Sequence, residues 1–347
     1  MKNNICYLYV VLSVLLSACT KDINSPIKHF DEKSAVKIQP TKIVKLEEFG
    51  ILRPFNFLQI DDSMFVIQDL KNEKIFNLIN LSSKKVISGI NKGQGPGEVL
   101  APSSLLFRDN KILVWDAMQK KMNEIVLASD TTLIIEEAYR IDTENIILFF
   151  VHQLDSTLVA TSQFDDYWLV EITKNGEIIS TINYPVWQET KGLQLTALSA
   201  LFRAARMANS PDKKRMVVAI GTHGFISFLN RTDFGLKEYK QIKYHPPKFK
   251  VTDRGSASYH RDNVGGFSAV DCDDNFVYAL YSGKTFNNNP MLSSHCEHLL
   301  VYDWDGNPVK RYVLDVPIFN TMSYDKENNC IYGLAENPEG VLIVYQL

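Results

Sequence analysis

Short apolar runs separated by tight polar turns recur along most of this chain. An acidic or polar cluster lies between two apolar runs at residues 60–66, and a nearly identical arrangement returns at residues 154–159. Asp and Asn side chains bond their own backbone in tight turns, and β-branched and aromatic residues favour a pleated surface. Each copy therefore predicts a β-hairpin. The copies lie at residues 60–66, 107–114, 154–159, 210–217, 270–277 and 324–331.

The spacing of these hairpins indicates how they assemble. Successive copies lie roughly 45 to 60 residues apart, which is the range for four-stranded propeller blades. Asn175-Gly176 and Asp305-Gly306 supply a second kind of hairpin turn in two of the repeats, because both central positions of such a turn tolerate positive φ. We therefore expect an all-β fold, a single six-bladed β-propeller of four-stranded antiparallel blades.

The last repeat lacks one strand. Residues 319–324, 330–334 and 341–347 supply three strands before the sequence stops, whereas an unpaired candidate strand, Lys42–Glu48, precedes the first blade. Because an open sheet edge invites unwanted pairing, we expect this N-terminal strand to join the last blade and close the ring.

One region departs from the strand pattern. Residues 193–207 carry apolar side chains at helical spacing. We expect a short helix or turn from about Leu195 to Ala200, followed by an inner strand that runs into Asn209.

The N-terminus has the outline of an export signal. Lys2 precedes a mostly apolar run from Ile5 to Leu16, which is too short to span a bilayer comfortably. Leu16-Ser17-Ala18-Cys19 resembles the lipobox of bacterial lipoproteins, which implies that Cys19 is acylated and holds the protein on a membrane. Residues 20–40 are polar with little periodicity, so few contacts are expected there. The predicted segments are a lipoprotein signal peptide at 1–18, a lipid-anchored tether at 19–40 and the propeller at 41–347.

Composition narrows the classes of partner. Hydrophobic residues make up 45% of the chain and the formal net charge is −3 without a long basic run, so no electrostatic argument favours nucleic acid as a partner. Of the five cysteines, Cys6 leaves with the signal and Cys19 carries the lipid. Small buried hydrophobes are the expected role of Cys272, Cys296 and Cys330, with a disulfide among them left open.

A glycine-rich motif follows the first predicted blade. Gly93-Gln94-Gly95-Pro96-Gly97-Glu98, with Ala101-Pro102 after it, resembles the G-x-G-P-G-E-F…P signature of a family of bacterial six-bladed propeller lipoproteins related to NHL and TolB-like propellers. Residues 300–309 and 331–334 are similar to the family's final repeats, although Val99 stands where the family usually has an aromatic residue. The resemblance implies a location outside the cytoplasm and a binding role, and it transfers no catalytic residues.

The same motif has a physical interpretation of its own. Its glycines permit backbone conformations denied to other residues and Pro96 stiffens the turn, which suits a crossing from one blade to the next. A phosphate-binding loop is the alternative, but Glu98 stands where a third glycine should lie and no helix is expected to begin there.

The candidate ligand site is the mouth of the central channel. The segment 254–263 leads into an inner strand expected near residues 267–270, and such loops border the channel of a propeller. Arginine, tyrosine and histidine side chains suit an anionic or sugar-like ligand, whereas a solvated connection is the alternative. The predicted ligand-binding residues are Arg254, Tyr259, His260, Arg261 and Asp262, with Arg203 and Arg206 joining from a neighbouring blade.

His295-Cys296-Glu297-His298 is the densest group of potential metal ligands, since thiolate and imidazole suit zinc. Alternate residues of a strand point to opposite sides, so at most two of these ligands converge. We leave open a weak metal site at His295, Cys296 and His298 and a metal ion in the central channel; the cofactor is otherwise unknown.

Two candidate functions are consistent with this sequence. The first is a non-enzymatic binding or scaffold protein, lipid-anchored in the bacterial cell envelope and facing the periplasm or the cell surface, that recognises a protein or a carbohydrate. The short motifs of common hydrolases, metalloproteases and redox proteins are absent, which favours it. The alternative is a propeller enzyme, a hydrolase or lyase acting on glycans, esters or lactones, with residues such as His260, Arg261 and Asp262 at the channel mouth.

Overall fold

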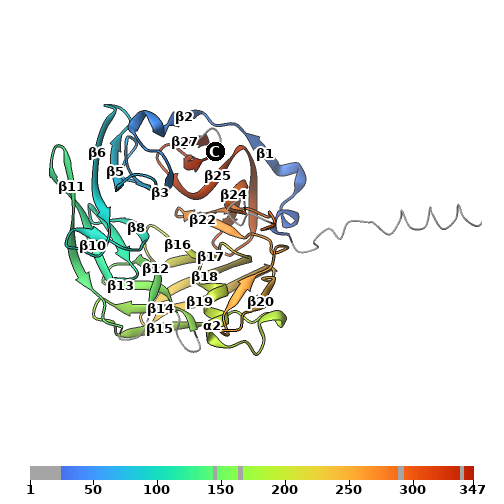
Figure 1. Cartoon of the computed structure of the whole chain (residues 1–347). Coiled ribbons are helices and arrows are strands. Elements are labelled where there is room, and N and C mark those ends of the chain that lie inside the picture. The colour runs from blue at the N-terminus through green and yellow to red at the C-terminus, as the bar shows by residue number, and fades with distance from the viewer. Residues whose placement is uncertain (1–24, 144–146, 163–166, 288–292, 337–339) are drawn as a thin grey trace, which may run out of the picture.

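A computed structural model shows antiparallel β-sheets arranged in a ring (Figure 1), and the innermost strands line a central channel. It describes residues 25–143, 147–162, 167–287, 293–336 and 340–347. The ring has six blades, each built from four antiparallel strands with its first strand at the channel. The predicted fold class is therefore confirmed.

Blades 1 to 3 follow one another along the chain. Blade 1 contains β3 (Pro54–Gln59), β4 (Met64–Asp69), β5 (Lys74–Asn80) and β6 (Lys85–Lys92); blade 2 contains β8 (Pro102–Arg108), β9 (Lys111–Asp116), β10 (Lys121–Ser129) and β11 (Thr132–Arg140); blade 3 contains β12 (Leu148–Gln153), β13 (Thr157–Ser162), β14 (Tyr167–Thr173) and β15 (Ile178–Asn183).

Blades 4 to 6 complete the ring, and one long strand, β25 (Pro308–Asp325), is shared by the last two. Its first half pairs with β24 as the outer strand of blade 5, and its second half pairs with β26 as the inner strand of blade 6. Blade 4 contains β16 (Ala205–Asn209), β17 (Arg215–Ile220), β18 (Gly224–Thr232) and β19 (Gly235–His245); blade 5 begins with β22 (Phe267–Cys272), β23 (Phe276–Tyr281) and β24 (His295–Asp303); blade 6 continues with β26 (Cys330–Ala335) and β27 (Val341–Gln346).

The six predicted hairpins are the turns between the first and second strands of the six blades. Asp61 Oδ1 accepts the backbone N–H groups of Ser63 and Met64, each at 2.8 Å, and Asp273 Oδ1 makes the same two bonds in blade 5, each at 2.7 Å. The Asn-Gly and Asp-Gly turns join the third and fourth strands of blades 3 and 5, as predicted. Local turn chemistry thus sets the repeat.

The N-terminal strand closes the ring, also as predicted. β2 (Lys42–Lys45) pairs antiparallel with β27 and becomes the fourth strand of blade 6. It is shorter than the expected Lys42–Glu48, because the chain turns into a 3-10 helix, η3 (Leu46–Phe49), that buries Leu46 and Phe49.

The segment before β2 packs against the ring. Here we define residues 26–38 as the N-terminal strap; it comprises η1 (Pro26–His29), η2 (Glu32–Ser34) and β1 (Ala35–Ile38). Phe30 is 3% exposed and lies edge-on to Tyr302, and β1 pairs parallel with the first half of β25. The expectation of few contacts in residues 20–40 is therefore wrong for the strap, because one buried aromatic and one short strand fasten it to blades 4 and 5.

The linker between blades 1 and 2 contains the glycine-rich motif, and the predicted crossing is confirmed. The two-residue β7 (Glu98–Val99) pairs with the end of β6, and Glu98 Oε2 accepts the N–H of Gly95 at 2.9 Å. The outer strands of these two blades also touch, because Gly89 of β6 presents no side chain to Leu133 of β11.

The helix-like region forms α2 (Leu195–Phe202) followed by β16, so the predicted helix and inner strand are both confirmed. A short 3-10 helix, η4 (Gln188–Thr190), precedes α2, and a two-stranded hairpin, β20 (Phe249–Val251) with β21 (Ala257–Tyr259), follows blade 4. Among the described residues, no helix has the length and apolar character needed to cross a membrane.

Candidate ligand site in the central channel

The inner strands of all six blades enclose a cavity of about 670 Å³ on the axis of the ring. Because the strands run along the channel, alternate side chains of each strand point into it. Its charged lining residues are Arg108, Arg206, Lys213 and Asp271, and its aromatic lining residues are Phe55, Phe57, Phe107 and Phe150.

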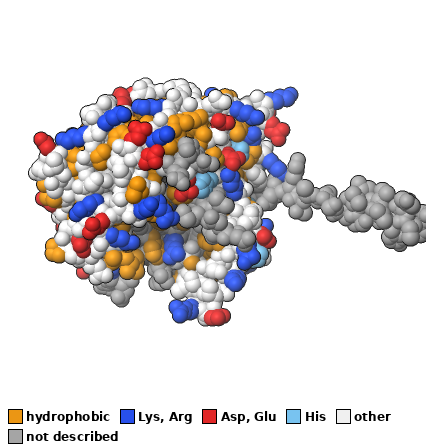
Figure 2. All heavy atoms as spheres, turned by 45° about the horizontal axis from the view of Figure 1, so that its top comes forward, with side chains coloured by type: hydrophobic (Ala, Val, Ile, Leu, Met, Phe, Trp, Pro, Cys, Tyr) orange, Lys and Arg blue, Asp and Glu red, His pale blue; other side chains and the backbone are white. Residues whose placement is uncertain are grey.

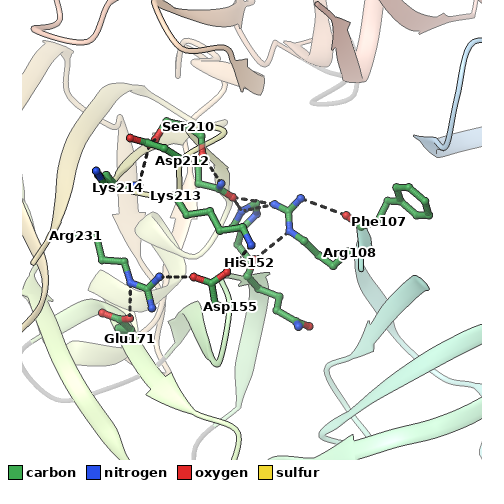
Figure 3. A network of polar contacts seen from close by, with 12 residues as sticks. Phe107, Arg108, His152, Asp155, Glu171, Ser210, Asp212, Lys213, Lys214 and Arg231 are labelled. Carbon is green, nitrogen blue, oxygen red and sulfur yellow. Dashed lines mark hydrogen bonds and ion pairs between the residues drawn. The ribbon is translucent and has the colours of Figure 1, made fainter. Parts of the chain in front are cut away.

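Arg108, at the end of β8, joins three blades. Its Nη2 donates to Asn209 Oδ1 of blade 4 at 2.8 Å and lies 3.1 Å from His152 Nε2 of blade 3, while its Nε donates to the carbonyl of Gln153 at 3.2 Å (Figure 3). Burial, together with the neighbouring guanidinium of Arg108, lowers the pKa of His152 to about 4. His152 is therefore neutral at pH 7, and the positive charge of this group lies on Arg108.

Arg206, at the second position of β16, makes a second cross-blade contact. Its Nε donates to the carbonyl of Ser268 at 2.6 Å and its Nη2 donates to Asn320 Oδ1 at 3.2 Å. The guanidinium stands 5.2 Å from the centre of the Phe150 ring, and burial lowers the pKa of Arg206 to about 10. With a 3.4 Å bond to the Ala205 carbonyl, its bonds to described residues use three of the five N–H donors. Two donors remain for a ligand.

Asp271 is the single carboxylate among the described lining residues, and it belongs to blade 5, opposite Arg108 in the ring. Its two oxygens accept the backbone N–H groups of Cys272 and Tyr324, each at 2.8 Å. Burial nevertheless raises the pKa of Asp271 to about 6. The lining therefore carries more positive than negative charge.

Lys213 lines the channel from the turn after β16, where its Nζ bonds Asp155 of blade 3 (Figure 3). Asp155 also accepts from Arg231 at 3.0 Å, and Arg231 Nε lies 3.7 Å from the buried Glu171. This network fastens blade 3 to blade 4 beside the Arg108 group. The charge of Lys213 is thus already compensated, whereas Arg108 and Arg206 have no carboxylate within 4.0 Å among the described residues; Arg108 keeps one N–H donor after its bonds to Gln153, Phe107, His152 and Asn209.

A sequence-family model described as TolB-like 6-blade propeller-like matches residues 30–323. The chain belongs to this family. No curated protein sequence matches it significantly. The predicted relation to TolB-like propellers is thus confirmed.

Solved structures share the fold of this TolB-like propeller at low sequence identity. A luciferin-regenerating enzyme is 10% identical with a TM-score of 0.51, covering 88% of this chain and 95% of its own. An inferred exported protein of Bacteroides fragilis is 14% identical with a TM-score of 0.52, and the match covers 90% of this chain and 99% of that protein. Regucalcin, a calcium-binding protein of Agrobacterium tumefaciens, is 13% identical with a TM-score of 0.50, covering 89% and 95%. At these identities the likeness shows the fold alone.

Most of the ligand residues predicted for this TolB-like propeller lie outside the channel. Tyr259 belongs to the β20–β21 hairpin, and its hydroxyl donates to the Leu201 carbonyl at 2.9 Å and to Thr222 Oγ1 at 2.7 Å. The hairpin folds back onto α2 before β22 begins, so the expectation that it borders the channel is wrong. Arg254, His260, Arg261 and Asp262 are exposed, with His260 Nδ1 3.5 Å from the Asp262 carboxylate.

The two arginines predicted to join the site from the neighbouring blade, Arg203 and Arg206, do not lie at the same place. Arg206 lines the channel, whereas Arg203 is exposed and stacks 5.5 Å from the centre of the Phe149 ring. Only Arg206 of the predicted set therefore reaches the cavity. Whether the hairpin residues bind a ligand of their own stays a prediction.

The residues predicted as metal ligands diverge. His295 Nε2 lies 2.9 Å from Glu336 Oε2, whereas Cys296 is buried with its Sγ 3.0 Å from Ser268 Oγ. Burial raises the pKa of Cys296 to about 11 and lowers that of His298 to about 4. In the part of the chain that the structure describes, no three His, Cys, Asp or Glu residues are placed to hold a metal together.

The remaining cysteines divide into two groups. Cys272, Cys296 and Cys330 are free thiols; the last two are buried, as expected, and Cys272 is partly exposed. Cys19, the predicted lipid attachment site, lies outside the described residues.

The sequence analysis missed Arg108, His152, Asn209 and Asp271. Arg108 and Asn209 are the last residues of their inner strands and directly precede hairpin turns. In the sequence they therefore look like part of the turn. The last residues of three inner strands, Gln59, Arg108 and Asn209, line the cavity, so comparing the strand ends of the repeats would have pointed to the channel.

Proposed function

We propose that this TolB-like propeller is a non-enzymatic binding protein of the bacterial cell envelope whose central channel binds an anionic carbohydrate. The observation that carries the proposal is the pair of guanidinium groups, Arg108 and Arg206, set into the channel wall against the single lining carboxylate of Asp271. Guanidinium groups are suited to carboxylate and phosphate groups, with which they form charge-assisted hydrogen bonds.

The rest of the lining suits a sugar ring. Phe55, Phe107 and Phe150 are partly exposed to the cavity, where aromatic faces accept the C–H groups of a pyranose. Amide and hydroxyl side chains between them provide partners for sugar hydroxyls. These polar lining residues are Asn56, Gln59, Gln68, Ser103, Ser104, Asn320, Thr321 and Ser323.

Calorimetric titration of the purified protein with glucuronate, and with glucose as the uncharged counterpart, tests this proposal. Glucuronate is expected to bind, and Arg206→Gln is expected to weaken it at least about tenfold, since a lost charge-assisted bond contributes roughly 1.5–3 kcal/mol. Arg254→Gln, on the exposed hairpin, is the matched control and should bind normally. Weaker binding in the hairpin variant alone would move the site to the hairpin, and equal affinity for both sugars would contradict the role of the arginines.

One observation favours the alternative of a hydrolase or lyase acting on glycans, esters or lactones. Asp271, with a pKa near 6, exchanges its proton close to neutral pH, as a general acid or base must. Turnover of any member of a panel of glycosides, esters and lactones, abolished by Asp271→Asn, would replace the binding proposal with this one. Unchanged turnover in the variant would exclude Asp271 from the chemistry.

We also propose that the protein is exported and held at the envelope by acylation of Cys19. The support is the lipobox-like sequence Leu16-Ser17-Ala18-Cys19 after the apolar run. Mass spectrometry of the N-terminal peptide from a membrane extract tests it: the expected product begins at an acylated Cys19. A soluble product that begins elsewhere would contradict the anchor.

A further inference from the structure

We propose that the N-terminal strap, with the neighbouring edge of blade 5, is a membrane-contact surface that lies against anionic lipid headgroups and holds the propeller on its side. The inference rests on the proposed acylation of Cys19, and it goes further by stating which part of the ring faces the bilayer.

The first step is the reach of the tether. Six residues, 20–25, separate Cys19 from Pro26, where the first element of the strap begins. Fully extended, that length spans at most roughly 25 Å. An acylated Cys19 therefore keeps the start of the strap close to the membrane surface.

The second step is that the strap is fixed to the ring. Phe30 packs in one cluster with Tyr244, Phe267 and Tyr302 of blades 4 and 5, and β1 is paired along β25 from Ala35 to Ile38. Figure 1 shows the strap on the outer side of the ring, away from the inner strands. The anchor therefore constrains the flank of the propeller rather than a channel mouth.

The third step is charge. The strap, residues 26–38, holds three lysines and two acidic residues, and residues 308–314 of blade 5 add Lys310 and Arg311, a net charge of +3 in a chain whose total is −3. Lys28, Lys33 and Lys37 are exposed, and within the described residues none lies within 4.0 Å of a carboxylate, unlike the paired Lys111, Lys284 and Lys326. Unpaired lysines close to an anionic bilayer contribute attraction additively.

Apolar side chains accompany these lysines. Val36, beside Lys37 in the strap, is 40% exposed, and Val309 at the start of β25 is 45% exposed. Figure 2 turns the top of Figure 1 toward the viewer and shows Lys and Arg side chains interspersed with apolar and acidic ones on that surface. Alternation of lysines with exposed aliphatic groups suits the headgroup region of a bilayer.

Side-on contact has a consequence for the proposed ligand site. The channel axis then runs parallel to the membrane, so both mouths face the aqueous phase instead of the lipid. A soluble anionic sugar could enter without competing with the bilayer.

The orientation is tested on the acylated full chain by amide hydrogen exchange in detergent and in vesicles of mixed phosphatidylcholine and phosphatidylglycerol. Slower exchange in vesicles is expected in residues 26–38 and 308–311. Added protection at the hairpin turns 60–63 or 326–329, or no added protection anywhere, would overturn the proposal.

The charges are tested separately with a chain that begins at Thr20, which retains every described element but cannot be acylated. Its sedimentation with phosphatidylglycerol vesicles is expected to weaken at least about tenfold in the variant Lys28→Glu/Lys33→Glu/Lys37→Glu. The matched control, Lys71→Glu/Lys74→Glu/Lys92→Glu on blade 1, makes the same charge change and should bind as the parent does. Equal loss in both variants, or no binding by the parent, would refute the lipid surface.

These results separate the surface from the anchor. If Cys19 is unmodified in membrane extracts while the Thr20 chain binds vesicles through the strap, the anchor is wrong and the surface stands. If Cys19 is acylated while the two triple variants behave alike, the anchor stands and the surface is wrong.

Discussion

The carboxylate of Glu98 fills the space beside Gly93 in which a side chain would lie. A Cβ built on Gly93 would be 1.9 Å from Glu98 Oε2, and the same oxygen accepts the N–H of Gly95 at 2.9 Å. The first glycine of the motif thus leaves room for the carboxylate of the motif's own glutamate, and both belong to the linker that sets blade 2 against blade 1.

Gly93→Ala is expected to destabilise the protein by about 1 kcal/mol, because the end of the Glu98 side chain must move and its hydrogen bond with the Gly95 N–H is lost. Gly95→Ala is the matched control: its Cβ would meet the same oxygen at 3.1 Å, so a smaller cost is expected. Chemical denaturation measures the loss of unfolding free energy in both variants. In a Glu98→Ala background the cost of Gly93→Ala should shrink; an unchanged cost would show that the carboxylate is not the obstacle.

The fold could be predicted because its signals are local. Asp61 and Asp273 bond their own turns, so the repeat of turn residues is also the repeat of blades. The closing strand was predictable for a different reason: a three-stranded last blade requires a partner, and β2 was the unpaired strand available.

The site could not be predicted in the same way. Arg108 and His152 are neighbours only because blades 2 and 3 lie side by side, and nothing near either residue in the chain indicates the other. The strap was missed because a single buried aromatic, Phe30, within a polar stretch produces no periodic pattern. The segment 254–263 was misplaced because no local pattern in the sequence indicates that Tyr259 packs against α2.

Two carboxylates of one network should differ in their effect on stability. Glu171 is buried and accepts from Thr157 Oγ1 at 2.7 Å and from the Leu236 N–H at 3.0 Å. Glu171→Ala removes the acceptor of the Thr157 hydroxyl and the buried carboxylate beside Arg231, whereas the Leu236 N–H keeps Ser180 Oγ at 2.9 Å; the expected cost is about 2–3 kcal/mol. Asp155→Ala removes an exposed partner of Lys213 and Arg231 and should cost under about 1 kcal/mol. Urea denaturation gives the unfolding free energy of both variants. Similar losses would mean that the burial of the carboxylate does not determine its contribution to stability.

The strap should contribute measurably to global stability. Phe30→Ala is expected to cost about 3 kcal/mol, since this side chain is 3% exposed and packs on Tyr302 and Tyr244. Val36→Ala, in the same strap but 40% exposed, should change stability by less than about 0.5 kcal/mol. If the two variants unfold at the same denaturant concentration, the strap is not part of the cooperative unit.

Asp271 should give the folded protein a pH dependence that Asp271→Asn lacks. The pKa of this carboxyl is about 6 in the folded chain against 3.8 for an ordinary aspartate, so between those values the native state binds more protons than the unfolded state. Its stabilising contribution is complete below about pH 4 and is lost as the pH rises through 6. The unfolding free energy of the parent minus that of Asp271→Asn should therefore fall across this window by up to about 3 kcal/mol.

Two other effects do not alter this trend. The hydrogen bond that asparagine cannot replace adds only a constant offset, and the opposite trend from His152 is present in both proteins. A difference that stays flat, or rises with pH, would show that the carboxyl is ionised throughout and that the channel is more negative than its burial implies.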